Sequence, residues 1–227
     1  MSDAITFFPG AGSFGSEFRT LVDHEPGARV VRYPGRMGKD FGVPADSFDD
    51  VVTACAEQVT GRPVLFGHSF GAYVAYATAS RLQEAGTEIS ALVVTGANAP
   101  NRLMVPSWAT TTPSDTAAYL DDVDPDILAD EPSDEWREIV AETAMHDLRL
   151  LARFDVASST KLRCPILAAR GDTDQLTSNE GIREWRHATH GPFSPRVFAG
   201  GHSEFLGSTA CTSWFHEATD TPEVRSK

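Results

Sequence analysis

Short apolar runs alternate with longer amphipathic stretches along most of the chain. Runs rich in β-branched and aromatic residues predict buried strands, and apolar positions that recur every three or four residues predict helices. Alternation of this kind favours a mostly parallel sheet with helices on both faces. The predicted strands are 4–8, 28–33, 63–66, 89–95, 165–169 and 195–198, and the predicted helices are 47–59, 71–85, 178–187 and 204–217.

The segment from 101 to 154 interrupts this alternation. It contains four prolines and helical patterns at 115–120 and 134–154. We interpret it as a helical lid insertion within one α/β domain that spans residues 1–227. At this point in the chain the insertion lies over the carboxyl ends of the strands, where open α/β sheets place their ligand sites.

The 227 residues carry a formal net charge of −13, which argues against nucleic-acid binding. No apolar run reaches the roughly 18 residues of a membrane span, and the first residues lack a signal-peptide pattern. Three widely spaced cysteines indicate neither a disulfide framework nor a metal site, so we expect a cytoplasmic protein without metal or other cofactor. We interpret the acidic residues between 113 and 142 as solvated surface.

The strongest chemical signal is GHSFG at 67–71, a G-x-S-x-G motif between a predicted strand and a predicted helix. In this context the serine occupies a strained turn, and the small residues beside it avoid steric clashes. The turn presents the hydroxyl at the edge of the sheet, next to a helix N-terminus that favours negative charge. We therefore predict that Ser69 is a catalytic nucleophile.

A serine nucleophile needs a base and an acid that orients the base. In α/β-hydrolases these follow the serine in the order acid, then histidine. Asp172 and Asp174 follow the predicted strand 165–169, and we favour Asp174 because it lies beyond the tight turn. His202 follows the last predicted strand, after two glycines that give its loop freedom, and is the predicted base.

The glycine loop in ITFFPGAGSFG, residues 5–15, has two interpretations. Its G-x-G-x-x-G spacing is that of a dinucleotide-binding loop. However, the end of the second strand holds Arg32 and Arg36 instead of the acid that binds a ribose, which leaves only an NADP site as an alternative. In a serine hydrolase the loop would supply one of two oxyanion donors, and the amide of Phe70 would supply the other.

Seven segments together resemble the type II (external, editing) thioesterases of polyketide and nonribosomal peptide synthesis. In the family the position of Gly10 is usually histidine, and a proline usually follows the aspartate where this chain has Gln175. The similar segments are FFPGAGSFGSEF, RYPGR, LFGHSFGAYVAYATASRLQ, TGANAP, AMHDLRLLARF, GDTD and FAGGHSEFL.

The resemblance implies an α/β-hydrolase fold with Ser69, Asp174 and His202 as the catalytic triad. It also implies that the amides of Ala11 and Phe70 form the oxyanion hole. The family hydrolyses acyl groups from the phosphopantetheine thiol of acyl carrier or peptidyl carrier proteins, so we expect these partners and a monomeric enzyme. Hydrolysis of small esters or amides, and acyl transfer or cyclisation, are the alternatives for a chain that departs from the family at Gly10 and Gln175.

Overall fold

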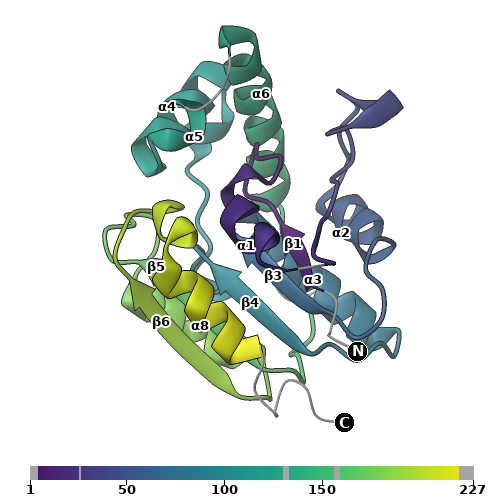
Figure 1. Ribbon diagram of the computed structural model, residues 1–227. Helices are drawn as coiled ribbons and strands as arrows, with labels where there is room; N and C mark the ends of the chain where they lie inside the picture. The colour runs from purple at the N-terminus through teal and green to yellow at the C-terminus, as the bar shows by residue number, and fades with distance from the viewer. Residues whose placement is uncertain (1–4, 26, 130–132, 156–158, 220–227) are drawn as a thin grey trace.

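The computed structural model describes residues 5–25, 27–129, 133–155 and 159–219. Its centre is a sheet of six parallel strands in the order β2-β1-β3-β4-β5-β6 (Figure 1). The predicted mostly parallel α/β architecture is therefore confirmed. The strands are β1 (Ile5–Phe8), β2 (Arg29–Val30), β3 (Val64–His68), β4 (Ala91–Thr95), β5 (Ile166–Gly171) and β6 (Phe193–Phe198).

Alternate residues of the central strands belong to two separate cores, one on each face of the sheet. In β1, Phe7 packs into the core that contains α1 and α8, whereas Phe8 packs into the core that contains α2 and α3. Because successive side chains of a strand point to opposite faces, a strand covered on both sides is apolar throughout. Figure 1 shows α8 in front of the sheet and α3 behind it.

Side-chain caps mark the first turn of several helices. Ser47 caps α2 by accepting the amide N–H of Asp50 at 3.1 Å, as expected for an N-cap serine. The α-helices are α1 (Arg19–Asp23), α2 (Phe48–Ala56), α3 (Phe70–Glu84), α4 (Pro113–Val123), α5 (Asp126–Ala129), α6 (Asp134–Leu151), α7 (Asn179–Arg183) and α8 (Thr209–Thr219). The 3₁₀ turns are η1 (Ser16–Phe18), η2 (Gly38–Asp40), η3 (Pro100–Arg102), η4 (Ser107–Thr110), η6 (Glu184–Ala188) and η7 (Glu204–Gly207).

Three predicted elements differ most from the observed ones. The predicted helix 178–187 is α7 followed by the 3₁₀ turn η6. The second strand is much shorter than 28–33, because only Arg29 and Val30 pair with β1 before the chain turns away. The predicted helix 204–217 is two elements, η7 and α8. Ser208 separates them, since its hydroxyl accepts the amide N–H of Cys211 at 3.1 Å and so starts a new helix.

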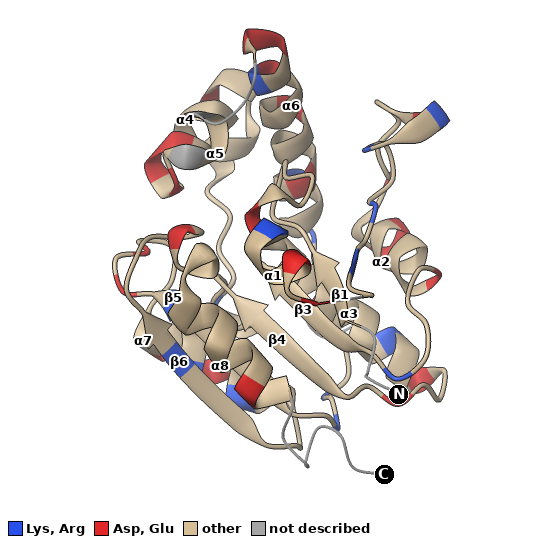
Figure 2. Ribbon diagram, in the orientation of Figure 1, with Lys and Arg blue, Asp and Glu red and all other residues tan. Residues whose placement is uncertain are grey.

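The chain between β4 and β5 forms a helical cap (α4, α5 and α6) that lies beyond the carboxyl ends of the strands (Figure 1). This is the place expected for the lid insertion. Many of its residues are acidic (Figure 2), but Asp124 is only 6% exposed, so the interpretation of the acidic residues in this segment as solvated is wrong at that residue. No helix in the described ranges is both long enough and apolar enough to cross a bilayer.

Candidate active site

A cavity of about 770 Å³ lies between the helical cap and the carboxyl ends of the strands. Three of the five predicted site residues, Ala11, Ser69 and His202, contribute to its wall, together with His68. Phe70 is buried directly behind Ser69 at the start of α3. The topology thus brings together loops that follow β1, β3 and β6.

Ser69 occupies a strained turn between β3 and α3. Its φ is 52°, and no other non-glycine residue in the described part of the chain has a positive φ. The flanking glycines have a steric reason: a Cβ at Gly67 would lie 2.3 Å from the carbonyl oxygen of Gly71, and one at Gly71 would lie 2.0 Å from that of Phe8. The motif therefore allows a turn so tight that the serine side chain projects into the cavity wall.

Asp174 and His202 face each other below the cavity. Nδ1 of His202 lies 3.2 Å from Oδ1 of Asp174, and the two residues are 2% and 3% exposed respectively. Burial by itself raises the pKa of Asp174, but contacts from His202, the Thr177 hydroxyl and the Leu176 amide lower the pKa to about 2. Asp174 is therefore an ionised acceptor that faces the imidazole.

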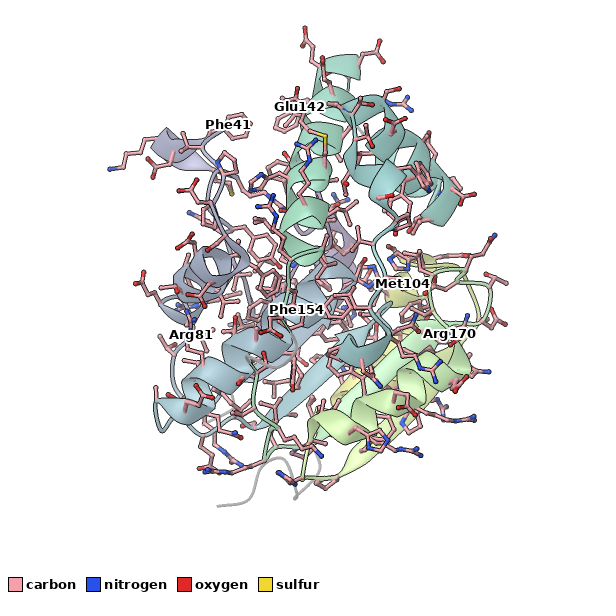
Figure 3. The ribbon with its side chains drawn as sticks, turned by 180° about the vertical axis from the view of Figure 1, so that it is seen from behind. Phe41, Arg81, Met104, Glu142, Phe154 and Arg170 are labelled. Atoms are coloured by element: carbon pink, nitrogen blue, oxygen red, sulfur yellow. The ribbon has the colours of Figure 1, made fainter. Side chains whose placement is uncertain are left out.

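Arg170, near the end of β5, holds the loop that carries Asp174 (Figure 3). Its guanidinium donates to the carbonyl oxygen of Asp174 at 2.6 Å and to the hydroxyl of Thr177 at 2.9 Å. Arg170 itself is only 8% exposed. The acid is thus held by a buried network rather than by a free loop, and sequence patterns did not indicate this role for Arg170.

Asp172, the other candidate acid, has a different position. It is exposed, and its Oδ1 accepts the amide N–H of Gly200 at 3.0 Å. This bond ties the turn after β5 to the glycine pair that precedes His202. Gly171 has no room for a side chain there, because its Cβ would lie 2.2 Å from the carbonyl oxygens of Gly200 and Gly201.

His68 is a buried second histidine at the site. Its ring centroid lies 4.8 Å from that of His202, and its nitrogens are 3.1 Å from the Thr95 hydroxyl and 3.0 Å from the Ser203 hydroxyl. Burial lowers the pKa of His68 well below its usual value, and His202 lowers it further. His68 is therefore a neutral side chain that connects β4 to the loop of His202, a contact that the sequence did not predict.

Carboxylates occupy two amides of the glycine loop. The amide N–H of Gly10 donates to Oε1 of Glu17 at 2.9 Å, and that of Gly12 donates to Oδ2 of Asp147 at 2.9 Å. Between them, the amide of Ala11 has no acceptor among the described residues. Two carboxylates at this loop disfavour a pyrophosphate, because like charges would meet there.

Gly15 has a steric role, because its φ is 97° and a Cβ there would lie 2.7 Å from Cγ1 of Val30. Arg36 does not act as a free surface charge: it is 5% exposed and pairs with Asp147. Neither role followed from spacing alone. Both residues do lie within the motifs that carried the family resemblance.

The cap supplies the apolar part of the cavity. Leu120 and Val123 come from α4, and Val140 and Leu148 come from α6. Phe154, by contrast, points into the core behind the cavity and packs on Phe48 at 4.7 Å between ring centroids (Figure 3). The site thus combines a serine at a strained turn, a buried histidine–carboxylate pair and an apolar compartment.

Comparisons with known proteins relate the whole chain to one family. A family model described as a thioesterase domain matches residues 4–218. The chain is 28% identical over 219 residues to the thioesterase TesA of Mycobacterium leprae, and the match covers 91% of this chain and 78% of that protein. It is 30% identical over 216 residues to the probable cadicidin biosynthesis thioesterase of Streptomyces griseus, and the match covers 88% of this chain but 58% of that protein.

Among solved structures, RedJ, a thioesterase from the prodiginine biosynthetic pathway of Streptomyces coelicolor, superposes with a TM-score of 0.83. The two chains are 26% identical, and the superposition covers 95% of this chain and 89% of RedJ. The similarity therefore includes both the sheet and the helical cap.

Proposed function

The chain belongs to the thioesterase family, and from this premise we propose that it hydrolyses acyl thioesters carried on the phosphopantetheine thiol of acyl carrier or peptidyl carrier proteins. The observation that carries the proposal is the joint position of Ser69 and His202 in the wall of one cavity, with Nδ1 of His202 3.2 Å from Asp174. With Nδ1 directed at the carboxylate, Nε2 is the nitrogen left for the serine hydroxyl.

The first half of the reaction forms an acyl-enzyme. His202 accepts the hydroxyl proton of Ser69, and Oγ attacks the carbonyl carbon of the thioester. The carbonyl π-electrons move to oxygen, where the amides of Ala11 and Phe70 stabilise the negative charge. As the tetrahedral adduct collapses, the C–S bond breaks and His202 returns the proton to the leaving thiolate.

The second half releases the acid. His202 removes a proton from water, the hydroxide attacks the acyl-enzyme, and the C–O bond to Ser69 breaks as His202 protonates Oγ. Asp174 stays ionised throughout and stabilises the imidazolium that forms in each half. The low pKa of Asp174, about 2, supports this role.

The position of the two oxyanion donors supports their assignment. Phe70 is the first residue of α3, so its amide has no acceptor within the helix. The amide of Ala11 is the one left unoccupied between Gly10 and Gly12. Ala11 lines the cavity and Phe70 directly follows Ser69, which also lines it. The carbonyl oxygen of a substrate bound at Ser69 would supply the acceptor that the two amides lack.

The apolar compartment beneath α4 and α6 is the proposed place of the acyl chain, and residues 101–154 act as the lid of a single domain. The names of the relatives support a carrier-bound substrate, since they refer to biosynthetic thioesterases. The acidic surface of the cap (Figure 2) is a poor contact for an acidic carrier protein. We therefore place carrier contact away from the acidic cap.

Mass spectrometry of acyl-loaded carrier proteins tests the proposal. The wild type should remove acyl groups from the pantetheine arm and release free acid, and Ser69→Ala should leave the loaded carrier intact. Circular dichroism should show that the variant stays folded. Release of acyl groups by Ser69→Ala at the wild-type rate would falsify the assignment, and preferential cleavage of simple esters, or transfer of the acyl group to another acceptor, would favour the alternative reactions.

A further inference from the structure

Two buried charged side chains contact the backbone of the glycine loop. Arg36 and Asp147 form an ion pair, and each residue is 5% exposed. Asp147 also accepts the amide N–H of Gly12 at 2.9 Å, and the Arg36 guanidinium donates to the carbonyl oxygen of Ser13. Three segments meet here: the loop after β1, the loop after β2 and helix α6 of the cap.

Two other side chains hold the start of the glycine loop, before Ala11. The Tyr33 hydroxyl donates to the carbonyl oxygen of Pro9 at 2.9 Å, and Glu17 accepts the amide N–H of Gly10. The Arg36 guanidinium also lies 4.8 Å from the ring centroid of Tyr33. Backbone groups on both sides of Ala11 are thus bound by side chains, whereas the Ala11 amide faces no protein acceptor in the described ranges.

A contribution to folding stability does not by itself explain a buried ion pair. Removing two charges from water is costly, and well-packed apolar residues at the same positions are often equally stable. Apolar residues at positions 36 and 147 could neither accept the amide N–H of Gly12 nor donate to the carbonyl oxygen of Ser13. The contacts that need these two residue types are therefore the contacts to the loop.

We propose that Arg36 and Asp147 are positioning residues that aim the Ala11 amide at the substrate carbonyl. The inference rests on the proposed function, in which Ala11 is an oxyanion donor. Neither side chain touches the substrate; both act through the backbone at Gly12 and Ser13. Because Asp147 lies on α6, the same pair fixes the cap helix relative to the nucleophile.

A small displacement of the loop would have a large kinetic effect. Loss of one oxyanion donor lowers kcat by roughly 10²- to 10³-fold in serine hydrolases. Misplacement of a reacting group by about 1 Å can cost about 10²-fold. A loop that is released but not destroyed should therefore lose about 10- to 100-fold in kcat with little change in KM.

The decisive variant replaces both charges together, Arg36→Met with Asp147→Leu. Single Asp147→Ala leaves a buried unpaired guanidinium, so it should lower both Tm and kcat. The double variant removes that unpaired charge, so Tm should recover toward the wild-type value while kcat stays about 10- to 100-fold low. A purely structural role predicts instead that kcat recovers together with Tm, and that result would overturn the proposal.

Arg36→Lys tests the same point without changing the charge. A lysine ammonium cannot reproduce the forked contact to Asp147 and to the Ser13 carbonyl, so kcat should fall although the ion pair remains. The matched control is Arg81→Met, which breaks the ion pair between Arg81 of α3 and Asp49 of α2. Figure 3 shows Arg81 away from the cap. Its kcat should equal that of the wild type.

A trifluoromethyl ketone analogue of the acyl-pantetheine substrate adds a binding readout. It forms a tetrahedral adduct with a serine nucleophile, so its inhibition constant should rise in the Arg36 and Asp147 variants by the same factor as kcat falls. An unchanged inhibition constant contradicts the proposal. If Ser69→Ala remains active, the proposed function itself fails; if Ser69→Ala is inactive and the double variant has wild-type kcat, only the positioning role fails.

Discussion

Nδ1 of His202 lies 3.2 Å from Oδ1 of Asp174, and at most 3% of either residue is exposed to solvent. The carboxylate is also held by the Thr177 hydroxyl at 2.6 Å and the Leu176 amide at 2.9 Å. These donors fix the carboxylate before any substrate binds. The arrangement therefore orients the imidazole, as the proposed mechanism requires.

Asp174→Asn should lower kcat by about 10³- to 10⁴-fold with little change in KM, because the amide no longer stabilises the imidazolium or its tautomer. Steady-state kinetics with an acyl-pantetheine thioester measures the loss. Asp172→Asn is the matched control, since Asp172 is exposed and contacts the amide of Gly200 rather than His202. Equal losses in the two variants would contradict the choice of Asp174.

Much of the fold followed from local patterns. The central strands β1, β3, β4 and β5 are buried on both faces, so their apolar runs are continuous, and their approximate positions were predictable. The resemblance to thioesterases is likewise confirmed by the family match over residues 4–218. The break at Ser208 was not predicted, because the apolar periodicity of 204–217 continues across it while the hydroxyl restarts the helix.

Roles that depend on contacts between residues far apart in the chain could not be predicted from local sequence patterns. Arg36 and Asp147 are 111 positions apart, and no local pattern pairs them. An arginine near the end of a strand is usually solvated, so the burial of Arg36 against Asp147 could not be predicted from its position in the chain. The position of His68 beside Ser69 was evident from the motif, but its contacts with Thr95 and Ser203 depend on residues far along the chain.

His68 should make the fold sensitive to mild acid. Burial keeps its folded-state pKa well below the unfolded value of about 6.5. Below that pH the unfolded chain binds a proton that the folded chain does not, so the free energy of unfolding falls as the pH drops, by up to about 1.4 kcal/mol per pH unit. His68→Asn should lose this component.

Urea denaturation of both proteins at about pH 7 and about pH 5 measures the difference. The wild type should lose more unfolding free energy over this interval than His68→Asn does. Identical losses in the two proteins would mean that the folded protein protonates His68 as readily as the unfolded chain.

Substitution by alanine should destabilise the fold strongly at Gly71 and only slightly at Gly10. A Cβ at Gly71 would lie 2.0 Å from the carbonyl oxygen of Phe8, so Gly71→Ala should cost more than about 3 kcal/mol or prevent folding. A Cβ at Gly10 would meet its nearest neighbours, among them Cβ of Ser69, at an ordinary 3.7 Å. Gly10→Ala should therefore change the free energy of unfolding by less than about 1 kcal/mol. Chemical denaturation measures both, and severe destabilisation by Gly10→Ala would contradict the space available at that position.

The apolar wall of the cavity should set the length of the acyl chain. Val123, at the end of α4, is half-buried and faces the cavity, so Val123→Trp should fill part of the acyl compartment. Excluding two methylene groups costs about 1.6 kcal/mol, which corresponds to about a 15-fold loss in kcat/KM. The loss should appear for long acyl chains and be absent for acetyl.

The matched control for this variant is Ala118→Trp, an exposed position on the same helix that is not among the cavity residues. A series of acyl-pantetheine thioesters from acetyl to dodecanoyl gives the chain-length profile of each protein. Ala118→Trp should retain the wild-type profile, whereas Val123→Trp should shift the optimum to shorter chains. Because Val123 lies in the cap and Ser69 lies in the turn before α3, a uniform loss across all chain lengths would place the acyl chain elsewhere.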